Sequence, residues 1–229
     1  WCRLPASPIP MAPAEVVADL ILTTHAHEDH LDPEAIPALA RATEAQFVGP
    51  CQCVEAMRRW GLAAERVVEM NRGDAQTLAG VGVSAVLAHH VSPAGAQTPD
   101  AVGYLLDLEG VIVYHTGDTL YHPDLQRVRD RAPDLLLVCI NGQYGNMTPQ
   151  EAAPVVTWLR ERRPGPDFTI SLRTGWDPLG MEPDRIRAER EQFEAAGIQY
   201  VVCAPWRTGL DEWLRSMEVL ASLVGLVPR

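Results

Sequence analysis

The sequence contains no lysine, since all 19 basic residues among its 229 are arginines. This absence excludes catalysis through a lysine Schiff base or a lysine nucleophile. The formal net charge of −11 argues against general binding to nucleic acid or to an anionic membrane, because proteins of those classes present basic surfaces. We expect a small-molecule substrate. Arg173 and Arg207 are candidates to pair with an anionic substrate, and surface ion pairing is the alternative for each.

Long apolar runs and paired cysteines are missing as well. We find no signal peptide and no apolar span of about 20 residues, so we expect a cytoplasmic protein that does not cross a membrane. The five cysteines include no Cys-x-x-Cys pair, which favours reduced structural thiols over a redox or metal motif. With 47% hydrophobic residues, the chain fits one domain over residues 1–229, as a monomer or as a homo-oligomer.

Histidine is concentrated in one part of the chain. All seven histidines lie between His25 and His122, and the densest group is the segment Thr24-His25-Ala26-His27-Glu28-Asp29-His30, directly after an apolar run. Neutral imidazoles and carboxylates suit borderline divalent cations such as zinc, manganese or iron. The segment therefore predicts a site for one or two metal ions. The alternative is a polar loop that happens to be rich in histidine.

This pattern, His-x-His-x-Asp-His after a hydrophobic strand, resembles the hallmark of the metallo-β-lactamase superfamily. Two later segments extend the resemblance. Val86-Leu87-Ala88-His89-His90 is similar to the strand end that delivers the third metal-binding histidine, and the alignment favours His90 over His89. Tyr114-His115-Thr116-Gly117-Asp118-Thr119 resembles the Gly-Asp-Thr turn, whose aspartate bridges two metals.

The resemblance implies an α/β fold, the αββα sandwich of two sheets flanked by helices, and hydrolysis by a metal-activated water. The implied ligands are His25, His27 and His90 for a first ion, Asp29 and His30 for a second, and Asp118 shared between them. Asp29 would also orient the nucleophile or act as a base, and Asp118 would hold the metals in register. His89 is a neighbour or an alternative ligand, and His122 begins a helix.

Two segments point to one branch of the superfamily, which includes L-ascorbate-6-phosphate lactonase. They are Ile140 to Ala152 and Gly175-Trp176-Asp177. At the second, the chain departs from the pattern, because Gly175 stands where the branch usually carries the last metal-binding histidine. Water or a carboxylate such as Asp177 would then complete the second site. The four prolines within residues 1–18 are incompatible with central strands, so we expect part of the N-terminal sheet to be missing.

Apolar periodicity and turn residues predict the secondary structure. Strands are expected near residues 19–24, 46–48, 66–69, 81–88, 102–108, 111–115, 134–140, 167–172 and 199–203. Helices are expected at residues 37–43, 51–60, 123–131, 149–163, 183–196 and 210–223. Glu109-Gly110 predicts a hairpin turn between two of the strands.

Three functional hypotheses follow from the sequence. The first is a metal-dependent hydrolase of lactonase type, acting on an ester, lactone or phosphoester with one or two zinc, manganese or iron ions. The second, motivated by Gly175, is a degenerate member that binds or regulates. The third is an incomplete fragment.

Overall fold

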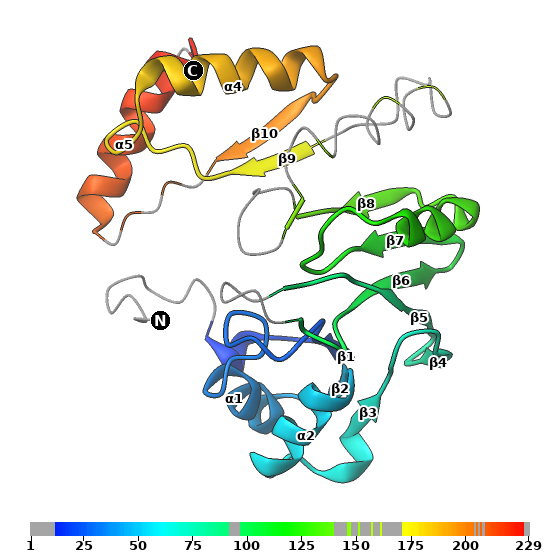
Figure 1. Cartoon of the computed structure of the whole chain (residues 1–229). Coiled ribbons are helices and arrows are strands. Elements are labelled where there is room, and N and C mark those ends of the chain that lie inside the picture. Colours follow the sequence, from blue (N-terminus) through cyan, green and yellow to red (C-terminus); the bar gives the residue numbers. More distant parts are fainter. Residues whose placement is uncertain are drawn as a thin grey trace. The chain divides into compact units, whose positions relative to one another are not determined.

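The computed structural model describes residues 12–91, 97–139, 146–147, 171–203 and 209–226, together with positions 151, 157, 161, 205 and 207. The chain divides into two compact units, which are Met11–Pro149 and Gln150–Arg229 with Trp1–Pro10. Figure 1 shows the elements of each unit. The single domain predicted over residues 1–229 stays a prediction.

The first unit begins with a parallel sheet of three strands. They are β1 (Leu20–Leu22), β2 (Gln46–Gly49) and β3 (Val67–Glu69), with β2 in the centre. Parallel neighbours need crossover connections, and helices α1 (Ala35–Ala42) and α2 (Cys51–Arg59) supply them. Phe47 of β2 packs in one core cluster with the helices, and Val48 packs in another on the opposite face. The central strand is therefore buried on both sides.

The second sheet of this unit has five strands in sequential order. They are β4 (Ala75–Leu78), β5 (Val81–Leu87), β6 (Val102–Leu108), β7 (Val111–His115) and β8 (Leu135–Leu137). The first four pair antiparallel, and β8 runs parallel to β7. The predicted hairpin is confirmed, with Glu109 and Gly110 at φ values of 55° and 93°.

Core clusters show how these layers stack. Val48 packs with Val83, Val102 and Tyr104, so the two sheets share one core. On the other face of the second sheet, Tyr114 packs with Val128 of the 3-10 helix η3 (Pro123–Arg131) and with Leu105. The unit therefore has four layers, in the order helices, sheet, sheet and 3-10 helix.

Side chains cap both helices of the first unit. At the start of α1, Asp32 Oδ1 accepts the amide N–H groups of Glu34 and Ala35 at 2.7 Å each. At α2, the amide of Gln52 donates to Asp100 Oδ2 at 2.8 Å, a contact across 48 positions. This second cap fixes α2 against the segment that precedes β6.

The second unit contains the C-terminal elements. Strands β9 (Ser171–Thr174) and β10 (Tyr200–Cys203) pair in parallel, and helices α4 (Pro183–Ala195) and α5 (Leu210–Leu223) follow β9 and β10. The buried Trp176 ring stacks on Phe193 with centroids 5.6 Å apart. Its Nε1–H donates to Glu189, so the indole ties the segment after β9 to α4.

The structure confirms some element predictions and corrects others. The helix predicted at residues 123–131 is present as a 3-10 helix, and β4 was not predicted. The strand predicted at 167–172 is β9 at Ser171–Thr174, while residues 167–170 lie outside the described residues. Within the predicted helix 149–163, positions 151, 157 and 161 are helical and the others are outside the described set. Residues 1–11, on which the expected loss of N-terminal sheet depends, are also outside it.

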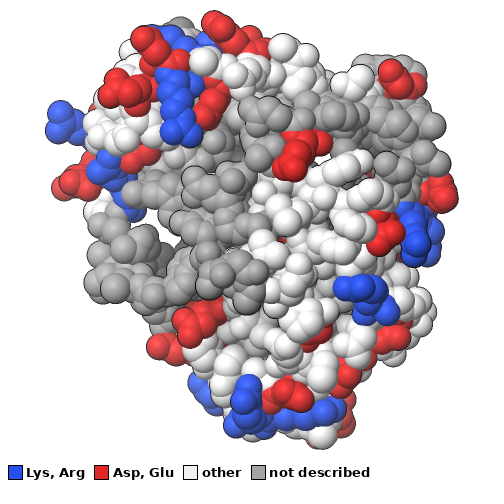
Figure 2. All heavy atoms as spheres, in the orientation of Figure 1, with Lys and Arg blue, Asp and Glu red and all other residues white. Residues whose placement is uncertain are grey.

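Charged side chains of both signs are mixed on the surface. On the face shown in Figure 2, arginines lie among aspartates and glutamates. In the parts of the chain that the structure describes, no helix is both long enough and apolar enough to span a membrane.

Candidate metal centre

Three imidazoles converge beside the end of β1. His25 and His90 are fully or almost fully buried, and the Nε2 atom of each lies 3.1 Å from Nδ1 of His27. Ligands of a tetrahedral ion with bonds of about 2.1 Å stand about 3.4 Å apart. The three nitrogens are therefore spaced like ligands of one small cation.

Burial and neighbouring groups keep His25 ready to bind a metal. Thr24 Oγ1 lies 3.0 Å from His25 Nδ1, so the hydroxyl can accept the Nδ1 proton and leave the Nε2 lone pair free. Burial, followed by the nearby His30, His90 and His27, lowers the pKa of His25 to about 3. The imidazole is therefore neutral, which is the form that ligates metals.

A second group shares His25 and adds a carboxylate. His30 Nε2 lies 3.4 Å from Asp118 Oδ2, and the His25 and His30 rings have centroids 4.2 Å apart. Burial works against the Asp118 charge, but hydrogen bonds from His30 and Asn146 outweigh it and lower the Asp118 pKa to about 2. Burial opposes the charge on His30 too, and the Asp118 hydrogen bond raises the pKa of His30 nevertheless. Asp118 is therefore a charged carboxylate that lies next to His25 and His30.

The turn that carries Asp118 is fixed by hydrogen bonds to the segment after β5. Gly117 has a φ of 62°, and a Cβ added there would lie 2.8 Å from the carbonyl oxygen of Val102. Thr119 Oγ1 accepts the amide N–H of His89, and the amide of Leu120 donates to the His89 carbonyl. These bonds join the turn to the neighbour of His90, which brings two distant ligands into one site.

Asp29 is placed differently from the predicted ligand set. Its carboxylate lies 3.6 Å from His30 Nε2 and is 48% exposed, and it is outside the close groups of three ligands found among the described residues. Those groups unite His25 with His27 and His90, and His25 with His30 and Asp118. His30 therefore lies between two carboxylates, and the role of Asp29 as a ligand or base stays a prediction.

Thr24 and Asn146 support the site but were not identified from the sequence. Asn146 is buried and hydrogen-bonds Asp118. Asn146 lies within the segment Ile140 to Ala152, and the resemblance of that segment to one branch of the superfamily was the available signal. For Thr24, the available signal was its position directly before His25.

The C-terminal unit contains the other two positions of interest, Gly175 and Asp177. Asp177 is buried, and its Oδ1 accepts the Ser216 hydroxyl at 2.8 Å and the Leu179 amide at 3.2 Å. Its Oδ2 lies 2.8 Å from Arg207 Nε. Both carboxylate oxygens are therefore engaged within their own unit, which accounts for Asp177 and Arg207 without a metal or a substrate.

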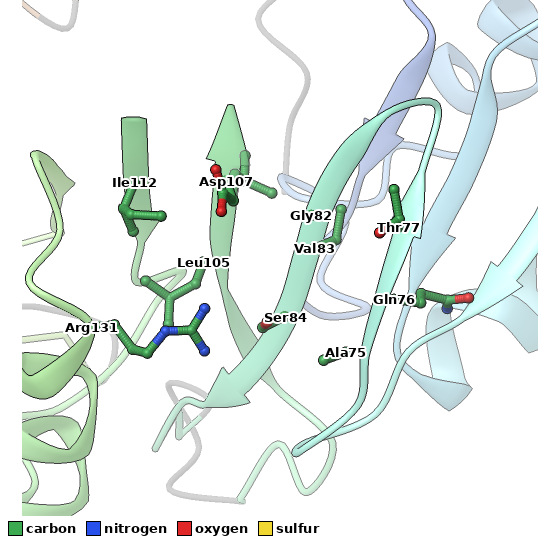
Figure 3. A pocket seen from close by; sticks show the side chains of 11 residues that line it. Ala75, Gln76, Thr77, Gly82, Val83, Ser84, Leu105, Asp107, Ile112 and Arg131 are labelled. Carbon is green, nitrogen blue, oxygen red and sulfur yellow. The ribbon is translucent and has the colours of Figure 1, made fainter. Parts of the chain in front are cut away.

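Two hollows lie near the described elements. One, of about 300 Å³, lies over the five-stranded sheet, where Leu105, Asp107 and Arg131 are among the residues that line it (Figure 3). Another, of about 470 Å³, is lined by residues of α2 and by Ala26 and Glu28, which alternate with the histidine ligands. Neither is lined by the converging histidines.

The comparisons with known proteins agree with this architecture. A family model described as "Beta-lactamase superfamily domain" matches residues 3–165. The chain belongs to this superfamily. Its fold is the predicted α/β metallo-β-lactamase fold, and the donor set of three imidazoles with a histidine and a carboxylate beside them fits a borderline divalent cation.

Relatives with similar sequences carry the name "UPF0173 metal-dependent hydrolase". One from Roseiflexus sp. (strain RS-1) is 32% identical over 195 residues, covering 80% of this chain and 74% of its own. One from Thermococcus kodakarensis is 34% identical over 178 residues, covering 76% and 75%. Among solved structures, Zn²⁺-bound PqqB from Methylobacterium extorquens is similar with a TM-score of 0.55 and 14% identity, over 81% of this chain and 70% of that one. The metallo-β-lactamase fold protein YhfI from Bacillus subtilis gives a TM-score of 0.52 and 14% identity, over 84% and 76%. At these identities both structures support the fold alone.

Proposed function

We propose that this protein is a metal-dependent hydrolase of the metallo-β-lactamase superfamily. The observation that carries the proposal is the convergence of His25, His27 and His90 nitrogens at 3.1 Å, with His30 and Asp118 beside them. The relatives named metal-dependent hydrolases support it. His25, His27 and His90 would hold one divalent ion, and His30 with Asp118 would contribute to a second. Such an ion, when bound, lowers the pKa of a water molecule toward about 7 and polarises a carbonyl or phosphoryl oxygen.

The remaining chemistry belongs to the side chains of the chain itself. Asp29 Oδ2 is half exposed and 3.6 Å from His30 Nε2, so it can accept a proton from a nucleophilic water at the edge of the centre. Asp118, kept charged by His30 and Asn146, holds His30 in place. Thr24 holds the His25 ring in the orientation that presents Nε2.

For the substrate, we propose a small ester, lactone or phosphoester, in keeping with the branch that includes L-ascorbate-6-phosphate lactonase. The segments Ile140 to Ala152 and Gly175-Trp176-Asp177 support that choice by their resemblance alone. We also propose zinc, manganese or iron as the metal, and the cytoplasm as the location. Cys51, Cys53 and Cys203 are free thiols, which fits a reducing compartment.

A degenerate family member that binds without turnover is the second candidate. Gly175 offers no side chain, and Asp177 is already bonded to Ser216, Leu179 and Arg207. One ligand fewer at the second ion would weaken or remove that ion. The protein would then retain the three-histidine group as a binding site.

The test combines metal content with turnover. The purified full chain would be loaded separately with Zn²⁺, Mn²⁺ or Fe²⁺ and assayed on a γ-lactone, on p-nitrophenyl acetate and on bis-p-nitrophenyl phosphate. We expect metal-dependent hydrolysis of at least one substrate and its loss in Asp118→Ala. Gly175→His serves as the gain-of-function partner, because it restores the side chain that the branch usually carries.

The outcomes separate the two candidates. Bound metal with turnover supports the hydrolase, and a rise in both with Gly175→His supports a site that lacks one ligand. Bound metal without turnover in either form would favour the degenerate member. A chain that binds none of the three metals contradicts both.

A further inference from the structure

A further group of potential ligands lies outside the centre described above. It consists of His89, which follows β5, with His122 and Asp124 at the start of η3, and one ligand atom from each lies within 4.8 Å of the others. We propose that these three residues form an accessory binding site for a borderline divalent cation such as Zn²⁺.

The contacts place polar atoms of the three residues close together and leave one of them unsatisfied. His89 Nε2 is buried and has no hydrogen-bond partner among the described residues, and its ring stacks on His122 with centroids 3.7 Å apart. His122 Nδ1 accepts the Asp124 amide N–H at 3.1 Å, which requires an unprotonated nitrogen, and the same atom lies 3.4 Å from Asp124 Oδ2. A nitrogen lone pair beside a carboxylate oxygen is repulsive unless a cation or a proton is shared between them. A divalent ion would neutralise the Asp124 carboxylate, replace the Asp124 amide as the partner of His122 Nδ1, and give the buried His89 nitrogen a partner.

The spacing and the chemistry agree with a metal site. The separation of 3.4 Å between His122 Nδ1 and Asp124 Oδ2 equals that between His30 Nε2 and Asp118 Oδ2 in the first centre. Two imidazoles and one carboxylate form a ligand set that zinc and iron accept, with a position left for water or an exogenous ligand.

The backbone holds the three ligands in place without a metal. The His89 amide donates to Thr119 Oγ1 at 2.9 Å, and its carbonyl accepts the Leu120 amide at 2.8 Å. The His122 carbonyl accepts the Leu125 amide at 2.9 Å. These bonds attach the accessory site to the turn that carries Asp118, so the two sites share a backbone but no ligand.

Arg127 carries a positive charge that competes with a cation for Asp124, so its removal gives a second test of the accessory site. Its Nη2 lies 3.5 Å from Asp124 Oδ1, and its side chain is 85% exposed. The arginine therefore neutralises part of the carboxylate charge that a cation would need. Removing it leaves the three ligands intact and is expected to tighten cation binding.

The experiment uses the full chain, freed of metal with a chelator and titrated with Zn²⁺. Bound equivalents would be counted by mass spectrometry after equilibrium dialysis for wild type, His122→Ala and Arg127→Ala. We expect His122→Ala to lose one equivalent, or to bind it at least about tenfold more weakly, with the equivalents of the first centre unchanged. Arg127→Ala should retain that equivalent with equal or higher affinity.

A measurement on wild type guards against misfolding of the variant. Long-range ¹⁵N–¹H spectra resolve imidazole nitrogens, and the signals of His89 and His122 should shift with the last Zn²⁺ equivalent. Equal Zn²⁺ stoichiometry and affinity in wild type and His122→Ala, or His122 signals that do not move at saturation, would overturn the accessory site. Either result leaves the hydrolase proposal untouched, because that proposal depends on His25, His27 and His90.

Discussion

The two units of the chain use their buried polar residues in opposite ways. In the unit Met11–Pro149, the buried histidines His25 and His90 each bring a ring nitrogen to within 3.1 Å of His27 Nδ1. In the C-terminal unit, the buried Asp177 is matched by Ser216 and Arg207. Polar groups that satisfy one another stabilise a fold, whereas convergent acceptors are suited to a cation from outside. Metal binding and the stability of the C-terminal unit should therefore be separable.

Loss of a central ligand should have the largest effect on metal binding in the unit Met11–Pro149. His27 Nδ1 lies 3.1 Å from two other ligand nitrogens, so His27→Ala should lower Zn²⁺ affinity by more than about 100-fold. Glu28→Ala changes the exposed neighbour and is the matched control. Metal content after dialysis against a competing chelator measures both. Equal metal retention by the two variants would contradict the assignment of His27.

A substitution at Asp177 tests the stability of the C-terminal unit. Asp177→Ala leaves Ser216 and Arg207 without their buried acceptor, so it should lower the stability of this unit by about 2–3 kcal/mol. Zn²⁺ binding should be unchanged. Asp184→Ala is the control, because Asp184 pairs with Arg187 on the surface of α4 and is 94% exposed. Hydrogen exchange of α5 reports the stability, and equal exchange rates in both variants would refute the structural role of Asp177.

Substitution of Gly117 tests how the conformation of the turn positions Asp118. Gly117→Ala combines a φ of 62° with a Cβ that would lie 2.8 Å from the Val102 carbonyl oxygen, so it should cost about 1–3 kcal/mol and weaken Zn²⁺ binding. Gly110→Ala has a similar positive φ but meets no atom within 4 Å. Chemical denaturation and Zn²⁺ titration of both variants isolate the close approach. Identical losses would show that conformation alone matters at Gly117.

The smallest effect concerns cysteine reactivity, which reports each unit separately. Burial raises the pKa of Cys53 in the first unit to about 12, so at pH 8 it should react with iodoacetamide only after unfolding. Cys203, partly exposed in the C-terminal unit, lies 3.4 Å from the Trp176 carbonyl oxygen. Asp177→Ala should speed labelling of Cys203 several-fold and leave Cys53 unchanged, as peptide mass spectrometry would show. Equal acceleration at both thiols would mean that the units unfold together.

Much of the fold was predictable because its signals are local. The apolar run before His25, the hairpin turn at Glu109-Gly110 and the capping carboxylate of Asp32 each act within a few residues. The strand β4 was missed because Ala75 to Leu78 shows little apolar alternation, and its first three residues are exposed. The segment 123–131 has helical periodicity, but it adopts the tighter 3-10 form.

The sequence by itself determined the family and the ligand types, because residue identity sets which atoms can bind a metal and because the His-rich segment is contiguous. Only the tertiary structure decided which ligands meet. His90 reaches His27 across 63 positions, and Asp118 reaches His30, because two sheets stack and hydrogen bonds tie the Gly117 turn to His89. Packing within the same unit placed His89 on His122, and packing within the C-terminal unit engaged Asp177 with Ser216. Neither contact is encoded in local spacing.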